Sequence, residues 1–580
     1  MTTAESQSNR RRIRNAVLGA AIGDAMGWPW ERVRRGTTPN VTTSGFLAWT
    51  RQAGSRFHRY DDPVAAGSYS DDTQLLAAVG RACLGDDWWQ RWTASELPSW
   101  PLHQRGGGRA VLAAARSWSA GVPPWKPPTS ATRTKQVRQY ANAGANGVAM
   151  RILPHAIVET DPHRLTHRVL RDGFTTHGHP RALIGATLYA AALRSLLTGV
   201  ESTELVAALE EDSVWSDMDI AMGAFHPQWY KTWRDVTGEP FRDVWGQART
   251  ETRDLLRHVA TAGPSSVDTD RSVLTGLGCF DPTRNGAGHV TAVAAVHCAT
   301  RAESPVDALA RSAFLVGADT DTLASMTAAL AALTSDDDWP TPLSEGVQDS
   351  AYLDALACAL DGVRRRRQGE ADDPTLPDLT TTASDARDAG RLASALLNSA
   401  ADMDADDALR LPDGRTATIA TVSPLSSKVR RLTVTIDDGQ TAVIDVRLPK
   451  PVTPSRATVD PSSPPVATVQ LRLPAQDLAR TADFYDQVLG LKVHRPSDDE
   501  LRISDELTFV ESTAERTRSA VDAFTVLRIQ VSDAAAAWDW VSALRLGEAA
   551  GGRPTEPNEP AYLRDPNGYR VAAIPVVPTD

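Results

Sequence analysis

Residues 18–33, "LGAAIGDAMGWPWERV", space three glycines at intervals of four along an apolar segment. Gly19, Gly23 and Gly27 fall on one face of a helix, because residues four positions apart are neighbours on a helix surface. Glycine has no Cβ, so another backbone can approach such a face closely. The stretch therefore predicts a helix that packs tightly on a neighbouring helix.

The surrounding chain keeps this helical character from Arg11 to about Arg365. Ala- and Leu-rich segments with helical spacing, such as 181–197, 290–302 and 323–333, are separated by Gly- and Pro-rich loops rather than by alternating strands. This pattern is typical of an all-α domain.

Beyond that domain the spacing of apolar residues changes. The segment 408–449 alternates apolar and polar residues around "PDG" and "DDGQ" turns, which predicts three or four β-strands. The segment 466–577 consists of two similar strand–helix–strand units, which indicates an internal duplication. The predicted organisation is an all-α domain (11–365), a linker with a helical segment (366–407), a small β unit (408–449), a Pro/Ser linker (450–465) and an α+β domain (466–577).

The bulk composition excludes several classes of protein. The 580 residues are 42% hydrophobic and 23% charged, as in ordinary globular proteins, and the net charge of −11 argues against wholesale wrapping of nucleic acid. The basic start "NRRRIRN" precedes an apolar run that Asp24 and three glycines soon interrupt, so it predicts a core helix rather than a secretory signal. Four separated cysteines fit a reducing cytosol. We expect a cytoplasmic protein.

Two short acidic motifs stand at the mouths of helix-like runs. "YSDDTQL" (69–75) contains Ser70, Asp71, Asp72 and Thr73. Ser and Asp suit a helix N-cap, because they accept hydrogen bonds from the free N–H groups of the first turn. The same side chains also suit a cation site built from oxygen ligands.

The second motif, "GADTDT" (317–322), repeats this arrangement with Asp319, Asp321 and Thr322. If the two helix mouths face each other, six of these oxygen-bearing side chains converge without nitrogen or sulfur. Such a set favours a hard cation, above all Mg²⁺, with room for two ions. Two unrelated helix caps are the alternative.

Asp24 and Glu31 add a third acidic region, and with it the motifs form a recognisable series. "LGAAIGDAMGWPWE", "YSDDTQL", "RGGGRAV", "ANGVAMRILP", "THGHPRA" and "GADTDTLASM" occur in the order seen in the ADP-ribosylglycohydrolase family, which includes the dinitrogenase reductase-activating glycohydrolases. The resemblance covers about 11–365.

The resemblance implies an all-α fold, two Mg²⁺ ions and hydrolysis of the bond that joins ADP-ribose to a protein side chain or another acceptor. It implies that Glu31 and Asp72 act in catalysis. The metal ligands that it implies are Ser70, Asp71, Asp72, Asp319, Asp321 and Thr322. The residues that it places against ADP-ribose are Gly106, Gly107, Gly108, Asn146, Gly147 and His177.

Each of these motifs has a plainer interpretation. Glu31 could pair with Arg32, Arg34 or Arg35, and His179, just before Pro180, suits a helix start. The sequence also departs from the arginine-directed members, where an acidic residue is expected beside the glycine loop. Here Arg105 and Arg109 flank it, so arginine, serine and nucleic-acid linkages all stay open.

The last segment resembles the vicinal oxygen chelate family, which includes glyoxalases and bleomycin-resistance proteins, through "LRLPAQDLARTADFYDQVLGLKV" and "LRDPNGYRV". The resemblance implies paired βαβββ modules. Of the four metal-ligand positions only Glu511 matches; Gln470, Val526 and Ala572 stand at the others, so we expect no metal catalysis there. A small-molecule pocket or a homodimer surface is expected instead.

The sequence therefore predicts a multidomain Mg²⁺-dependent hydrolase that removes ADP-ribose from a protein or another conjugate. We expect no membrane partner and no sequence-specific binding of nucleic acid. The alternatives are a catalytically silent ADP-ribose reader that neutralises a toxin, or sequestration of a small molecule by the C-terminal domain.

Overall fold

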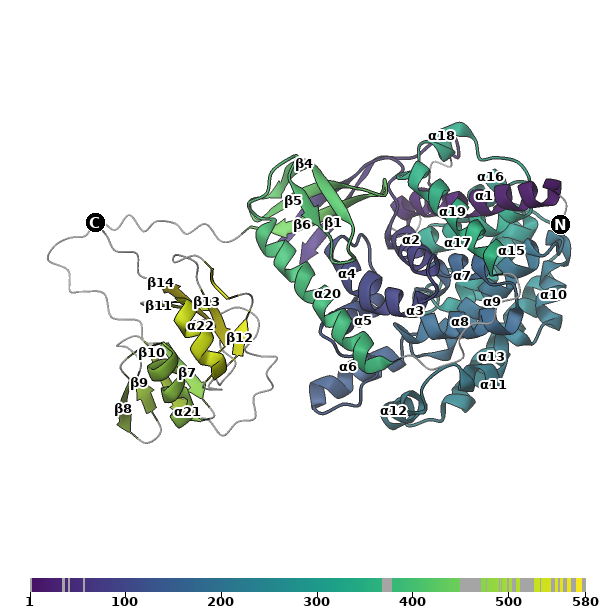
Figure 1. Ribbon diagram of the computed structural model, residues 1–580. Helices are drawn as coiled ribbons and strands as arrows, with labels where there is room; N and C mark the ends of the chain where they lie inside the picture. Colours follow the sequence, from purple (N-terminus) through teal and green to yellow (C-terminus); the bar gives the residue numbers. More distant parts are fainter. Residues whose placement is uncertain are drawn as a thin grey trace. The chain divides into compact units, whose positions relative to one another are not determined.

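The chain folds into two compact units in this computed structural model, Met1–Pro451 and Val452–Asp580, each described here by itself (Figure 1). The structure describes residues 3–33, 37–39, 42–55, 58–367, 378–448, 471–475, 477–489, 491, 493–497, 500–502, 507–511, 526–531, 534–543, 548–550, 553–555, 561–564 and 570–575.

The first unit is mainly helical, as the sequence predicts. Its described helices are α1 (Thr3–Gly27), α2 (Asp71–Cys83), α3 (Trp88–Arg91), α4 (Leu97–Ser99), α5 (Arg109–Ser119), α6 (Ala131–Ala141), α7 (Leu153–Val158), α8 (Pro162–Phe174), α9 (Pro180–Leu197), α10 (Leu205–Glu211), α11 (Met218–Gly223), α12 (Pro227–Thr237), α13 (Phe241–Ala260), α14 (Val267–Leu277), α15 (Gly288–Arg301), α16 (Pro305–Ser312), α17 (Thr320–Leu333), α18 (Thr341–Ser344), α19 (Ser350–Arg366) and α20 (Leu379–Ser399). Their apolar faces share one continuous core.

The glycine face of α1 lies directly on α17, which confirms the predicted close helix pair. A Cβ added at Gly23 would lie 2.3 Å from the Ala324 carbonyl oxygen, and one added at Gly27 would lie 2.2 Å from the Thr320 carbonyl oxygen. The Thr320 hydroxyl donates a 2.8 Å hydrogen bond to the Gly27 carbonyl at the same crossing. Side chains at these positions would force the two helices apart.

One element of the helical region was not predicted. Strands β1 (Trp49–Ser55) and β2 (His58–Val64) form an antiparallel hairpin. Its segment has no clean alternation of apolar and polar residues, because charged residues such as Arg51 and Asp62 pair across the two strands. The hairpin lies beside the small sheet that follows the helical domain (Figure 1).

That small sheet consists of β3 (Ala408–Arg410), β4 (Thr416–Ser426), β5 (Val429–Ile436) and β6 (Thr441–Arg447), antiparallel and in sequence order. We call it the β unit. The glycines of both predicted turns, Gly414 and Gly439, have φ values of 92° and 91°, which favour glycine.

The helix predicted within 366–407 is α20, and it packs against two other parts of the first unit. A Cβ added at Gly390 would lie 2.3 Å from the Ser119 carbonyl oxygen of α5. Leu396 joins the apolar core of the β unit together with Leu102 of the helical region. Helix α20 therefore shares packing with both the helices and the sheet.

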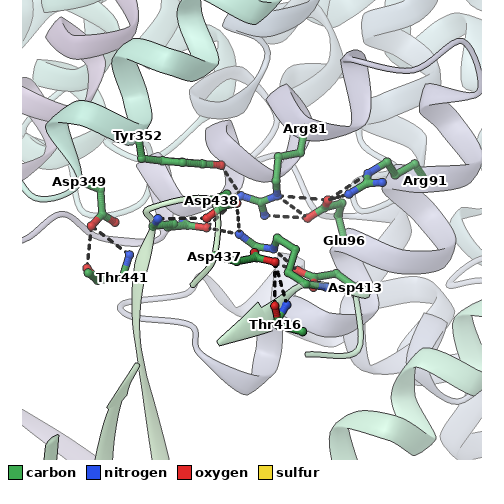
Figure 2. A network of polar contacts seen from close by, with 12 residues as sticks. Arg81, Arg91, Glu96, Asp349, Tyr352, Asp413, Thr416, Asp437, Asp438 and Thr441 are labelled. Carbon is green, nitrogen blue, oxygen red and sulfur yellow. Dashed lines mark hydrogen bonds and ion pairs between the residues drawn. The ribbon is translucent and has the colours of Figure 1, made fainter. Parts of the chain in front are cut away.

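A buried ionic cluster joins the β unit to α2 (Figure 2). Arg81 of α2 donates to Glu96 at 2.7 Å, to the Tyr352 hydroxyl at 2.7 Å and to the Gln440 side-chain oxygen at 3.0 Å. Arg415 of the β unit donates to the same Gln440 oxygen at 2.7 Å. Because charged groups are costly to bury without partners, this shared acceptor fixes the β unit against α2.

A second buried cluster centres on Asp62 of β2. One carboxylate oxygen accepts from Arg105 at 2.9 Å and from Arg431 of β5 at 2.6 Å, while the other accepts from Arg51 at 2.5 Å. Arg431 also donates twice to Asp445 of β6. Burial by itself raises the pKa of Asp62, but the three arginines outweigh it, so this pKa lies below its ordinary value.

The second unit contains two modules with the same topology. Its described elements are β7 (Leu471–Ala475), α21 (Leu478–Asp483), β8 (His494–Ser497), β9 (Glu500–Arg502), β10 (Leu507–Glu511), β11 (Val526–Val531), α22 (Ala534–Ala543), β12 (Glu548–Ala550), β13 (Ala561–Arg564) and β14 (Arg570–Pro575). The sheet orders are β7-β10-β9-β8 and β11-β14-β13-β12, with a parallel first pair in each. The predicted duplication of a βαβββ module is confirmed.

Among the described helices, none combines the length and the apolar character that crossing a membrane requires.

The α1–α17 contact predicts opposite effects for two helical glycines. We expect Gly23→Ala to lower the free energy of unfolding by about 2 kcal/mol or more, because the added methyl overlaps the α17 backbone. Gly246→Ala in α13 meets nothing within 4 Å and should stabilise by up to about 1 kcal/mol. Urea unfolding monitored by circular dichroism measures the free energy of unfolding of both variants. Equal changes in that free energy would contradict the packing argument.

The Asp62 cluster predicts a pH-dependent loss of stability. At pH 7, Asp62→Asn should lower the free energy of unfolding by about 3 kcal/mol or more, because the buried Arg105 and Arg431 and the partly exposed Arg51 lose a counter-charge. Since the folded-state pKa of Asp62 is lowered, its contribution is present above the unfolded pKa of about 4 and is lost as the pH falls through the folded value. The difference in melting temperature between wild type and variant should therefore shrink below about pH 4. Asp61→Asn, at an exposed position of the same strand, is the matched control and should show no such dependence.

Candidate functional site

Three helix ends meet where the acidic motifs lie. The α1–α17 packing carries Asp24, on α1, to the start of α17, where Asp319 and Asp321 stand. Glu31 follows α1 after the short helical turn Trp28–Trp30. The N-terminus of α2 supplies the third group of acids.

Asp24 fastens α1 to the first turn of α2. Its carboxylate accepts hydrogen bonds from the Ser70 backbone N–H at 3.0 Å, the Thr73 backbone N–H at 3.0 Å and the Thr73 hydroxyl at 2.6 Å. The carboxylate therefore satisfies free N–H groups at the mouth of the helix, where a negative charge is also favoured. In this way Asp24 orients the two residues that lie between Ser70 and Thr73, namely Asp71 and Asp72.

The helix-cap interpretation is confirmed for the first motif and fails for part of the second. The Ser70 hydroxyl accepts from the Asp72 N–H at 3.2 Å, as an N-cap does. Asp319 occupies the N-cap position of α17, but its side chain makes no capping hydrogen bond to the backbone of that helix. Its Oδ2 atom instead accepts from the Asn146 side chain at 2.9 Å.

The acidic side chains are buried close enough to raise one another's pKa. Burial raises the pKa of Asp71 to about 7, and the charge of Asp24 adds to that rise. Burial likewise raises the pKa of Asp72 and of Asp321, with further contributions from neighbouring carboxylates that include Asp319. Asp71 is only 7% exposed and Asp72 only 3%. Buried carboxylates that repel one another are stabilised by a proton or by a cation.

Asp72 has one carboxylate oxygen, Oδ2, that is buried without a hydrogen-bond partner among the described residues. Such an atom is rare in folded proteins because leaving it unsatisfied costs free energy. Among the described residues, no three His, Cys, Asp or Glu side chains are grouped so that they could hold a metal ion. The acids therefore interact electrostatically without forming a ready-made set of metal ligands.

Glu31 lies at the edge of this cluster. Burial raises its pKa, the charge of Arg32 opposes that rise, and the charge of Asp319 adds to it. Arg32 donates a long, 3.4 Å contact to Glu31, so the predicted pairing with Arg32 is present. Arg34 and Arg35 lie outside the described residues. Glu31 is thus a partly exposed carboxylate that faces the buried acids.

The glycine loop 105–108 covers Asp71. Gly106 has a φ of 90°, and a Cβ there would lie 3.0 Å from Asp71 Oδ1. The Gly108 N–H donates to Asp71 Oδ2 at 3.4 Å, and a Cβ at Gly108 would meet nothing within 4 Å. The Gly107 N–H is already used by the Gln104 side chain at 2.9 Å. The loop therefore presents Gly106 and Gly108, rather than the Gly107 N–H, to the acidic cluster.

Comparison with known protein families decides the identity of this region. The family model of ADP-ribosylglycohydrolase matches residues 5–370. The chain belongs to the ADP-ribosylglycohydrolase family. Residues 467–573 match the glyoxalase/bleomycin resistance protein/dioxygenase superfamily. No curated protein matches the chain.

Solved structures are similar to portions of the chain. A structure described as an ADP-ribosylglycohydrolase-related protein complex is 20% identical, with a TM-score of 0.42; the match covers 62% of this chain and 99% of that one. A glyoxalase I mutant from Zea mays is 21% identical, with a TM-score of 0.16; the match covers 27% of this chain and 59% of that one. A protein of unknown function from Agrobacterium tumefaciens is 15% identical, with a TM-score of 0.17, and the match covers 20% of this chain and 100% of that one.

Within this ADP-ribosylglycohydrolase fold, Asn146 positions a predicted ligand. Its side chain donates to Asp319 and also to the Thr291 hydroxyl, at 3.1 Å. Gly147 packs on His177, since a Cβ there would lie 3.0 Å from the imidazole Cε1 atom. His177 is 1% exposed, and burial lowers its pKa to about 3. His177 therefore supports the 145–147 loop as a neutral side chain.

A second glycine loop, residues 285–288, was missed by the sequence analysis. The Asn146 N–H donates to the Gly286 carbonyl at 2.9 Å, and the Gly288 N–H donates to the Gly144 carbonyl at 3.0 Å. A Cβ at Gly286 would lie 3.2 Å from Asp319 Oδ2. The signal was available in "NGAG", which repeats the Asn and Gly pattern of "ANG".

Elsewhere, the His179 side chain accepts from the Arg181 N–H at 3.1 Å, which confirms it as a helix-start residue.

The ligand positions considered in the C-terminal modules are only partly described. Ala572 is buried in β14 opposite Arg528 and Tyr562, and Val526 begins β11. Glu511 ends β10. Gln470 lies outside the described residues.

The mutual repulsion of the acids makes a direct prediction. In a chelator at pH 8, we expect Asp71→Asn to be more stable than wild type by about 1–2 kcal/mol, because it removes one charge from a buried like-charged cluster. Asp161→Asn is the matched control: Asp161 caps α8 through a 2.9 Å hydrogen bond from the Arg164 N–H, and Asn caps a helix about as well. Thermal unfolding measures both; a loss of stability in Asp71→Asn would contradict the prediction.

Proposed function

We propose that this protein hydrolyses the glycosidic bond between ADP-ribose and an acceptor in a reaction that depends on two Mg²⁺ ions. The observation that carries the proposal is the buried cluster of carboxylates with an unpartnered Asp72 oxygen, in a chain of the ADP-ribosylglycohydrolase family. The residues that would hold the ions are Ser70, Asp71, Asp72, Asp319, Asp321 and Thr322.

The donor chemistry fits Mg²⁺. All six side chains offer oxygen, the ligand atom that a small hard cation prefers, and no thiol or imidazole belongs to the set. Burial and mutual repulsion raise the pKa of Asp71, Asp72 and Asp321, and a divalent cation offsets both effects. The Asn146 hydrogen bond would hold Asp319 in place as a ligand.

When bound, Mg²⁺ would polarise ribose hydroxyls and water at this site. Glu31 would accept the proton of the attacking water, because its raised pKa and partial exposure suit a general base. The free oxygen of Asp72 would orient that water. The bond from water oxygen to the anomeric carbon forms as the bond to the acceptor breaks, through an oxocarbenium-like state.

Two glycine loops would receive the ADP-ribose moiety. Gly106 and Gly108 bring backbone beside Asp71 without side chains in the way, while the Gly107 N–H is held by Gln104. Asn146 and Gly147 do the same beside Asp319, with His177 packed beneath them. Backbone N–H groups that can approach phosphate oxygens closely are a common means of binding a diphosphate.

The acceptor would be a protein side chain or another ADP-ribosylated molecule in the cytoplasm. The free state of Cys83, Cys279, Cys298 and Cys358 supports a reducing compartment. The C-terminal unit, which matches the glyoxalase superfamily, would bind a small molecule or form a homodimer.

Release of free ADP-ribose from arginine-, serine- and nucleic-acid-linked conjugates tests this function, with Mg²⁺ and with EDTA. Asp72→Asn, Asp319→Asn and Glu31→Gln should each lower the rate by about a hundredfold or more, while Asp161→Asn should not. Release that persists in EDTA would overturn the Mg²⁺ dependence. Tight ADP-ribose binding without release from any conjugate would favour a reader of ADP-ribose over a hydrolase.

A further inference from the structure

A cavity of about 800 Å³ lies between the helical region and the β unit. The hairpin β1–β2 and the loops that lead into α2 and α5 form one wall, and strands β4, β5 and β6 form the other. Lining residues that matter for its chemistry are Trp49, Val64, Gln74, Arg105, Arg431 and Thr433. A volume of this size accommodates a compact organic group.

The β-unit wall lies outside the part of the chain that matches the ADP-ribosylglycohydrolase family, which ends at residue 370. Both buried ionic clusters hold this wall in place, one through Gln440 and one through Arg431. The cavity is therefore bounded by fixed walls, one of which belongs to this chain's own additional domain.

Positive charge exceeds negative charge in the part of the cavity near Asp62. Arg51, Arg105 and Arg431 share the two carboxylates of Asp62 and Asp445 there, whereas the Asp349 carboxylate accepts hydrogen bonds from the lining residues Tyr69, Gln348 and Thr441. Arg431 is fully engaged, because all three of its guanidinium nitrogens donate to these carboxylates.

Arg105 keeps spare hydrogen-bonding capacity. Its guanidinium donates only through Nη2, to Asp62, and its Nε atom is buried without a partner among the described residues. Burial lowers the pKa of Arg105 to about 10, and the nearby charges of Arg431 and Arg51 contribute to that fall. A cation that is desolvated and surrounded by other cations is stabilised by an additional anion.

The cavity adjoins the acidic cluster through two shared elements. Arg105 lines the cavity, and the next residue, Gly106, lies against Asp71. Gln74 also lines the cavity from the first turn of α2, and its side-chain oxygen accepts from the Arg105 backbone N–H at 3.1 Å. A molecule bound at the acidic cluster could therefore extend past Gly106 towards Arg105.

We propose that this cavity is the acceptor subsite, and that it favours acceptors that leave as anions, namely a carboxylate or a phosphate. The inference rests on the proposed hydrolase function. As water attacks the anomeric carbon, the bonding electron pair passes to the acceptor oxygen and the proton of water passes to Glu31. Negative charge then develops on the acceptor, and the spare donors of Arg105 stabilise it.

The same charge disfavours an arginine-linked conjugate. Its acceptor carries a guanidinium group, which the excess positive charge of the cluster around Asp62 would repel. The fixed β-unit wall and the size of the cavity favour a small acceptor or a chain end over a folded protein surface. The β unit is thus a determinant of acceptor specificity.

The test compares kcat/KM for four conjugates with the full chain and Mg²⁺: ADP-ribose linked to a glutamate carboxylate, to a terminal oligonucleotide phosphate, to serine and to arginine. We expect the first two to be cleaved at least about tenfold better than the arginine conjugate. Arg105→Gln should lower kcat/KM for the anionic acceptors by about tenfold or more, with the inhibition constant of free ADP-ribose unchanged. The larger loss of the two identifies carboxylate or phosphate as the preferred group.

Two variants of the far wall serve as a matched pair. Thr433→Phe fills the cavity from β5 and should reproduce the selective loss, whereas Thr435→Phe, at an exposed position of the same strand, should not. Equal losses on all four conjugates, or none, would overturn the acceptor subsite while leaving the hydrolase function in place. Absence of turnover on every conjugate would overturn the proposed function and this inference with it.

Discussion

The close approach of α1 to α17 is the constraint on which the site depends. Gly23 and Gly27 place the α1 backbone against Ala324 and Thr320, where any side chain would overlap the carbonyl oxygens of α17. This contact sets Asp24 and Glu31 beside the start of α17. Asp24 then fixes α2 through three hydrogen bonds to its first turn, so helices far apart in the sequence present their acidic ends to one region.

The resulting cluster holds carboxylates whose charged form is disfavoured. Burial and mutual repulsion raise the pKa of its carboxylates, and one oxygen of Asp72 lacks a partner among the described residues. Asp62, elsewhere in the first unit, shows the opposite effect on its pKa. Its carboxylate is also buried, yet three arginines lower its pKa. The contrast marks the acidic cluster as a candidate functional site, because buried carboxylates with raised pKa values gather at such sites.

The β unit extends the family fold without being a loose appendage. It shares an apolar core with Leu102 and Leu396, and its Gln440 and Arg431 belong to buried clusters that include α2 and the β1–β2 hairpin. Buried charged contacts of this kind fix relative position, because displacing one partner leaves the other desolvated and unpaired. The cavity beside Arg105 follows from that attachment.

The sequence by itself determined the helical domain, the β unit, the duplicated C-terminal modules and the acidic motifs, because each depends on local periodicity, turn residues or the order of motifs. It did not reveal the hairpin around Asp62, whose strands lack alternation because their charged residues pair with one another and with distant arginines. Nor did it reveal the 285–288 loop beside Asp319. The tertiary structure alone decided that Asn146 holds Asp319, that His177 is buried and that Arg105 faces a cavity, because these facts depend on contacts between segments far apart in the chain.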